Sequence, residues 1–236
     1  EETHDICDEA KRVIETYLQE RLEDKNSAAG AKFALQANYD WRERREISTD
    51  APTRAAIAGG EMTMEAVPLT SLLGTAQDRI APDPAAMVTG LAKYGETDLL
   101  CYWAEDAELA ALQAREWQPV LDWAAATHGA RLAVTEGLMP VTQPAESLDA
   151  LRAAVATHGT EELAALGLAV PSLGSLVLGL ALSAARLTAA EALRLAVLDE
   201  TFQERRWGTD WEAEQRRARA AADLDLAKRF LALVRS

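Results

Sequence analysis

The stretch LAALGLAVPSLGSLVLGLALSAA, residues 163–185, carries no charged side chain. Its length would suffice for a helix that crosses a bilayer. However, Pro171 lies near its middle and Gly167 precedes it, and both residue types interrupt helices. We therefore predict a short helix that ends near Gly167, a turn, and a buried helix over about 171–185. A helix at the centre of a core is apolar on all sides, so we expect no membrane insertion.

Capping signals predict further helices on both sides of this segment. Asp83–Pro84 places a proline directly after an N-cap residue, and Gly95 closes that helix. Thr188 with Glu191, and Thr209 with Glu212, match the capping box, in which each side chain satisfies a free backbone amide. The predicted helices are 84–95, 106–127, 146–157, 188–206 and 210–234.

The rest of the pattern also favours helices. Residues 6–22 place apolar side chains on one stripe at helical spacing, and a second helix is expected over about 31–39. The alternating stretch RLAVTE, residues 131–136, is the best strand candidate. We predict a mainly α protein in three parts: a helical segment over 1–50, a linker with a small α+β part over 51–105, and a helical domain over 106–236.

Composition excludes several classes of protein. Of the 236 residues, 49% are apolar, which excludes a wholly disordered chain. The net charge of −14 argues against a generic nucleic-acid binder, because phosphate attraction requires a basic surface, and it suits a basic partner. Cys7 and Cys101 are too few for a disulfide framework, so we expect a reducing compartment. The acidic, polar first residues do not resemble a signal peptide.

Sequence motifs for catalysis are absent. The chain has no glycine-rich phosphate loop, no GxGxxG and no GxSxG. His4, His128 and His158 are far apart and lack metal-ligand spacing. His128 and His158 precede glycines at predicted helix ends, where histidine suits the negative end of the helix dipole. We expect no catalytic residue, metal or cofactor, although a carboxylate-only site that pairs Glu200 or Glu136 with a second acid stays open.

The predicted helix over 188–206 has two apolar stripes. A solvated helix needs only one, so the second stripe, which also carries acids, either packs internally or meets a partner. Burying Glu200 beside apolar neighbours requires a cation, which a partner or one of Arg205, Arg206 and the Arg216–Arg217 pair would supply. One stripe holds Leu195, Leu198 and Phe202, and the other holds Leu193, Val197, Glu200 and Glu204.

The chain has six tryptophans, of which most are expected in the core. Large amphipathic rings also anchor protein interfaces. Trp207 is followed by a glycine between two predicted helices, and it is therefore our interface candidate.

Five blocks from about Val67 onward resemble the assembly chaperones of F-type ATP synthase, which occur in mitochondria and alphaproteobacteria. They appear in the order of that family. The blocks are VPLTSLLGTAQDRI (67–80), YGETDLLCYWAE (94–105), WQPVLDWAAATHGARLAVTEGLMPVTQP (117–144), SLGSLVLGLAL (172–182) and LDETFQERRWGTD (198–210).

This resemblance implies a non-enzymatic chaperone that binds the unassembled alpha subunit of the catalytic head until the beta subunit replaces it. We expect a monomer in the bacterial cytoplasm or the mitochondrial matrix, without nucleic acid. The family's important acidic position is carried to Glu200, and as a second choice to Asp199. The candidate partner-binding residues are Glu200, Asp199, Glu204, Val197, Leu193 and Trp207.

The N-terminal segment departs from that family, whose members begin with a β-rich domain. Residues 1–50 show no alternation, and NSAAGAKFALQANYDWRERREI (26–47), within a match over about 10–47, is similar to small phage DNA-packaging (terminase small-subunit) proteins. A phage-related DNA-packaging adaptor, or a fusion protein, is therefore the alternative function.

Overall fold

The computed structural model describes residues 67–235 apart from 138, 140, 209 and 210. The chain divides into two units, Glu1–Pro82 and Asp83–Ser236. The predicted helices over 6–22 and 31–39, and the resemblance over 10–47, lie outside the described residues. In the first unit, α4 (Pro68–Thr75) continues into a π-helical turn, η2 (Ala76–Ile80).

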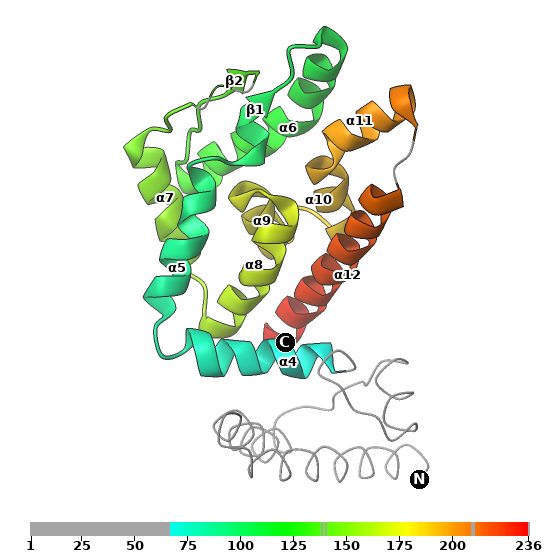
Figure 1. The fold of residues 1–236 in the computed structure, drawn as a ribbon. Helices are drawn as coiled ribbons and strands as arrows, with labels where there is room; N and C mark the ends of the chain where they lie inside the picture. Colours follow the sequence, from blue (N-terminus) through cyan, green and yellow to red (C-terminus); the bar gives the residue numbers. More distant parts are fainter. Residues whose placement is uncertain (1–66, 138, 140, 209–210, 236) are drawn as a thin grey trace. The chain divides into compact units, whose positions relative to one another are not determined.

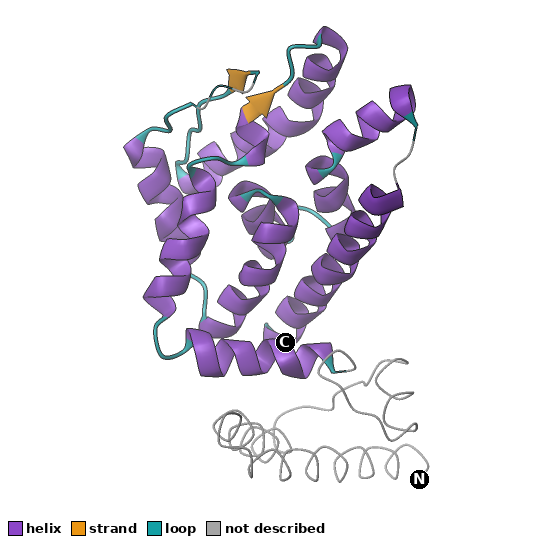
Figure 2. Cartoon of the chain, viewed as in Figure 1, coloured by secondary structure: helices purple, strands orange, loops and turns teal. Residues whose placement is uncertain are grey.

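The second unit is built almost entirely of helices (Figures 1 and 2), which confirms the mainly α prediction. Asp83 caps the first of them by accepting a hydrogen bond from Ala86 N–H, as the sequence predicted. Two short 3-10 turns follow, η3 (Lys93–Gly95) and η4 (Leu99–Cys101). The helices are α5 (Pro84–Ala92), α6 (Ala107–His128), α7 (Ala145–Ala156), α8 (Thr160–Leu173), α9 (Leu176–Ser183), α10 (Ala189–Ala196), α11 (Leu198–Trp207) and α12 (Trp211–Val234).

The strand prediction over 131–136 is only partly right. β2 contains only Thr135–Glu136, which pairs in parallel with β1, Tyr102–Trp103. Because β1 is two residues long, only two residues of the alternating stretch find a backbone partner. The other residues of that stretch connect α6 to β2 without regular structure.

The uncharged stretch forms most of α8 and the whole of α9, and both helices lie in the core. All eight residues of α9 are buried, and α8 and α9 pack on each other with α5, α7, α10 and α12 around them. None of the helices in the described part of the chain combines the length and apolarity that a bilayer crossing needs.

The predicted break in this stretch lies at the wrong place. α8 continues through Gly167 and Pro171, and it ends at Gly174, whose φ of 63° is left-handed. Gly167 serves packing, because a Cβ there would lie 2.2 Å from Met87 Cε of α5. Ser175 then caps α9 by accepting a hydrogen bond from Leu178 N–H.

Asp98 holds the buried N-terminus of α9. It is 0% exposed. Its carboxylate accepts hydrogen bonds from Ser175 Oγ at 2.7 Å and Val177 N–H at 3.0 Å, and a third from Leu100 N–H at 3.1 Å. Burial raises the pKa of Asp98, and these hydrogen bonds oppose that shift. The Thr-Asp-Leu-Leu block thus ties its own loop to the central helix.

α6 links the core to α10. Asp106 caps its start. Gly129, with a φ of 76°, ends it, as the sequence predicted. Trp117 is fully buried, and its indole N–H donates to Leu195 O at 2.9 Å. Because Leu195 is the penultimate residue of α10, this bond fixes the position from which α11 departs.

Candidate functional site

The candidate partner-binding residues lie on two short helices rather than on one long helix. The Thr188–Glu191 capping box opens α10 as predicted. The predicted helix over 188–206 is wrong in one respect, because it breaks at Val197, whose φ and ψ are −104° and 20°. Leu193 therefore belongs to α10, whereas Glu200, Glu204 and Trp207 belong to α11. Leu193 and Val197 are half-buried.

α11 packs through the apolar face that the sequence predicted. Leu198 and Phe202 are each 6% exposed. Arg206 covers this face from outside, with its Cζ 4.7 Å from the centre of the Phe202 ring. The same guanidinium reaches Asp106 and Glu108 at 2.8 Å each, at the start of α6. Arg206 is thus engaged by the start of α6, whereas Glu200 pairs with Arg217.

Arg217 of α12 pairs with both glutamates of α11. Its Nη1 lies 2.6 Å from Glu204 Oε1 and 3.6 Å from Glu200 Oε2. Glu204 and Arg217 are each 19% exposed at the side chain, whereas Glu200 is 48% exposed. The Glu204 carboxylate raises the pKa of Arg217. The internal salt bridge left open by the sequence therefore exists, and it leaves about half of the Glu200 side chain accessible to a partner.

Asp199 points inward and is held by a buried amide. Gln113 of α6 is 0% exposed. Its Oε1 accepts from Ala104 N–H at 2.7 Å, so its Nε2 is oriented to donate to Asp199 Oδ1 at 2.8 Å. Burial raises the pKa of Asp199, the Gln113 hydrogen bond opposes this shift, and the charge of Glu200 adds to it. The position of Asp199 therefore fits a structural link between α11 and α6.

Trp207 and Trp211 flank the connection between α11 and α12, and both are exposed. Trp207 is 82% exposed, and its indole N–H donates to Gln203 Oε1 at 3.1 Å on the same helix. Trp211, the first residue of α12, is 63% exposed. The sequence reasoning selected Trp207 but missed Trp211. Trp211 lies only four residues after Trp207, and this spacing could have marked it as a second interface candidate.

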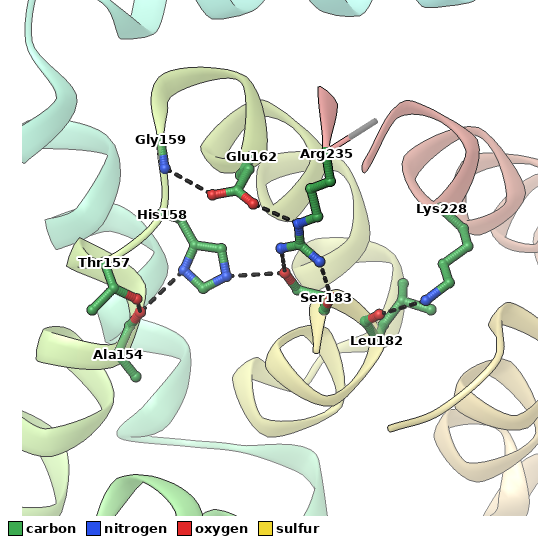
Figure 3. Close-up of polar contacts among 9 residues, drawn as sticks. All are labelled: Ala154, Thr157, His158, Gly159, Glu162, Leu182, Ser183, Lys228 and Arg235. Carbon is green, nitrogen blue, oxygen red and sulfur yellow. Dashed lines mark hydrogen bonds and ion pairs between the residues drawn. The ribbon is translucent and has the colours of Figure 1, made fainter. Parts of the chain in front are cut away.

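His158 and Ser183 form a histidine–serine contact that resembles a catalytic pair (Figure 3). His158 Nε2 lies 2.9 Å from Ser183 Oγ, and its Nδ1 lies 3.0 Å from Ala154 O. However, Ser183 is 1% exposed, so a substrate has no access to its hydroxyl.

Cationic side chains complete this cluster by capping the end of α9. Arg235 donates to Ser183 Oγ at 2.9 Å and also to the Ser183 carbonyl, and Lys228 donates to Leu182 O at 3.0 Å. Arg235 also donates to Glu162 Oε1 at 2.6 Å, at the start of α8. Cations near the last carbonyls of a helix stabilise its negative end. The cluster therefore anchors α12 to the core helices.

The remaining titratable candidates do not assemble into a site. Among the described residues, no group of three or more histidine, cysteine or acidic side chains has the arrangement of a metal site. Cys101 is 0% exposed and burial raises the pKa of its thiol to about 12, as expected for a core cysteine. His128 ends α6 as predicted, but burial lowers its pKa and favours the neutral ring, so the dipole interpretation is outweighed. Glu136 is exposed at the end of β2.

Comparison with known proteins gives a family match. A family model described as ATP12 chaperone protein matches residues 33–125. This match begins before the described residues and overlaps the end of the segment that resembles phage DNA-packaging proteins.

Solved structures show the same likeness over most of the chain. Atp12 from Paracoccus denitrificans is 38% identical, with 78% of this chain and 82% of that chain covered and a TM-score of 0.70. An aspartate-to-lysine mutant of the Paracoccus protein gives 37% identity, 78% and 81% coverage, and a TM-score of 0.71. A proposed chaperone from Agrobacterium tumefaciens is 34% identical, with 78% and 72% coverage and a TM-score of 0.70.

Proposed function

Because the chain belongs to the ATP12 chaperone family, we propose that it binds the unassembled alpha subunit of the F-type ATP synthase catalytic head. It shields the interface of that subunit from aggregation until the beta subunit replaces it. A subunit without its partner exposes an apolar patch that is prone to aggregate. The protein works by binding, as a monomer and without a cofactor, in the bacterial cytoplasm or the mitochondrial matrix.

One observation carries this proposal: Trp207 is 82% exposed on a helix that is otherwise well anchored. An exposed indole on a rigid element is a typical anchor of a protein interface. Hydrogen bonds and ion pairs from α6 and α12 hold α11 in place. The side chain of Trp207 is therefore presented to a partner by a helix whose own contacts are satisfied.

Glu200 supplies the charge of this site. It lies seven residues before Trp207, so both side chains point to the same face of α11. Its ion-pair partner, Arg217, is closer to Glu204, which leaves Glu200 the more available carboxylate for a lysine or arginine of the alpha subunit. Glu204 supports the site by pairing with Arg217. Asp199 fixes α11 through its hydrogen bond with Gln113.

Suppression of aggregation tests the proposal directly. Purified alpha subunit is diluted from denaturant, and its light scattering is followed with and without the chaperone. The beta subunit serves as the client control. We expect protection of the alpha subunit alone, and loss of protection in Glu200→Lys.

A matched variant separates the site from general charge effects. Asp225→Lys makes the same charge change at an exposed carboxylate of α12, and it is expected to protect as the wild type does. Circular dichroism establishes that both variants are folded. If the wild type leaves the alpha subunit aggregating at its own rate, the proposed function is wrong.

A further inference from the structure

An exposed tryptophan lies at the end of α11 and another at the start of α12. Trp207 and Trp211 are separated by four peptide steps, so their Cα atoms lie at most about 14 Å apart. They are 82% and 63% exposed. Two exposed indoles within this reach provide more apolar surface than a single exposed residue does.

The surroundings of the two indoles are acidic on balance. Residues 199–217 contain six carboxylates and four arginines. Two of those arginines are already occupied, because Arg206 pairs with Asp106 and Glu108, and Arg217 pairs with Glu204. Glu200 and Glu214 are exposed near the indoles. A partner that places a cation here gains both a carboxylate and the face of an indole, which attracts cations.

We propose that Trp207 and Trp211 form one docking surface, and that its occupant is a basic, apolar segment of the client protein. This inference rests on the proposed function and names the part of the client that the site takes. An anionic membrane and a second copy of the acidic chain, of net charge −14, would both be repelled. A segment in which apolar side chains alternate with lysine or arginine matches both features.

The size of the surface fits a central anchor. Two buried indoles supply roughly 300–500 Å², which is about half of the ~800 Å² that one partner contributes to a stable interface. We therefore expect this surface to carry much of the affinity, while other residues complete the contact area.

The experiment compares the binding of the full chain with that of two variants. The full chain, and its Trp207→Ala/Trp211→Ala double variant, are titrated with freshly refolded alpha subunit by biolayer interferometry. They are also titrated with a 15-residue peptide of alternating leucine and lysine, followed by fluorescence polarisation. Met139→Ala, which truncates another exposed apolar side chain at 76% exposure, is the matched control. A peptide with glutamate in place of lysine tests the charge preference.

We expect the double variant to bind both ligands at least about tenfold more weakly, as loss of interface anchors does. The Met139→Ala variant should bind as the wild type does, and the glutamate peptide should not bind. Because both indoles are exposed, the unfolding midpoint of the double variant should stay unchanged.

The outcomes separate this inference from the proposed function. If the wild type binds the alpha subunit and the double variant binds it equally well, the docking surface is wrong and the proposed function stands. If the wild type binds the lysine peptide through the two indoles but ignores the alpha subunit, the surface is supported and the proposed client is wrong. Self-association or binding to anionic vesicles that the double variant abolishes would overturn the choice of occupant.

Discussion

Replacing Asp98 by asparagine should destabilise the fold more than its small change in shape suggests. The carboxylate accepts hydrogen bonds from Leu100 N–H, Ser175 Oγ and Val177 N–H in a fully buried position. Ser175 Oγ itself accepts from Leu178 N–H, so its hydroxyl proton must point to Asp98. An amide can offer its oxygen to one side only, and its NH₂ group then faces a donor on the other side.

The magnitude follows from the bonds that are lost. A hydrogen bond to a charged group contributes about 1.5–3 kcal/mol, and a buried donor without an acceptor costs about 1–3 kcal/mol. The lower cost of burying an amide rather than a carboxylate offsets part of this loss. We expect a net destabilisation of about 2–3 kcal/mol, which corresponds to a fall in Tm of roughly 5–10 °C.

Urea unfolding followed by circular dichroism measures this effect. Asp83→Asn is the matched control, because Asp83 caps α5 at an exposed position. Asparagine caps a helix as well as aspartate does, so the control should change stability by less than about 0.5 kcal/mol. If both variants unfold at the same urea concentration, Asp98 does not hold the start of α9 and the reasoning is refuted.

Three further predictions concern single side chains. Arg217→Ala leaves the 19% exposed Glu204 without its cation, so it should lower the unfolding free energy by about 1–2 kcal/mol. Urea unfolding measures this change, and an unchanged midpoint would contradict the prediction. His128 has a pKa lowered by burial and then by His158, so the unfolded chain takes up the proton first and stability falls as pH drops through about 6.5. His128→Gln should weaken this dependence of Tm between pH 7.5 and 5.5. Burial raises the pKa of the Cys101 thiol to about 12, so Cys101 should resist iodoacetamide in the native protein and react on unfolding. Peptide mapping by mass spectrometry measures the labelling. Rapid labelling of the native protein would be inconsistent with the burial of Cys101.

Helix boundaries with local partners could be predicted from the sequence. Thr188 and Glu191 bond to each other's backbone across three residues, and Asp106 bonds to Glu108 and Leu109. The boundaries were predictable because both members of each pair lie in the same window of sequence.

Boundaries and pairs that depend on distant contacts were not predictable. The break at Val197 follows from the separate anchoring of two helices, since α10 accepts the Trp117 indole and α11 is bound through Gln113 and Arg206. The sequence left several arginines open as partners of Glu200. Only the arrangement of α11, α6 and α12 assigns Arg206 to α6 and Arg217 to the glutamates.

The sequence by itself determined the mainly helical fold and the family of this protein. Helical periodicity, caps and ordered motifs each depend on residues that are close together in the sequence. The tertiary structure alone decided which similar side chains are buried. Trp117 is 0% exposed and Trp207 is 82% exposed, although both lie on helices. The difference arises because the burial of Trp117 depends on α10, whose Leu195 carbonyl lies 78 residues away in the chain, whereas Trp207 lies beyond the face that α11 packs against the core.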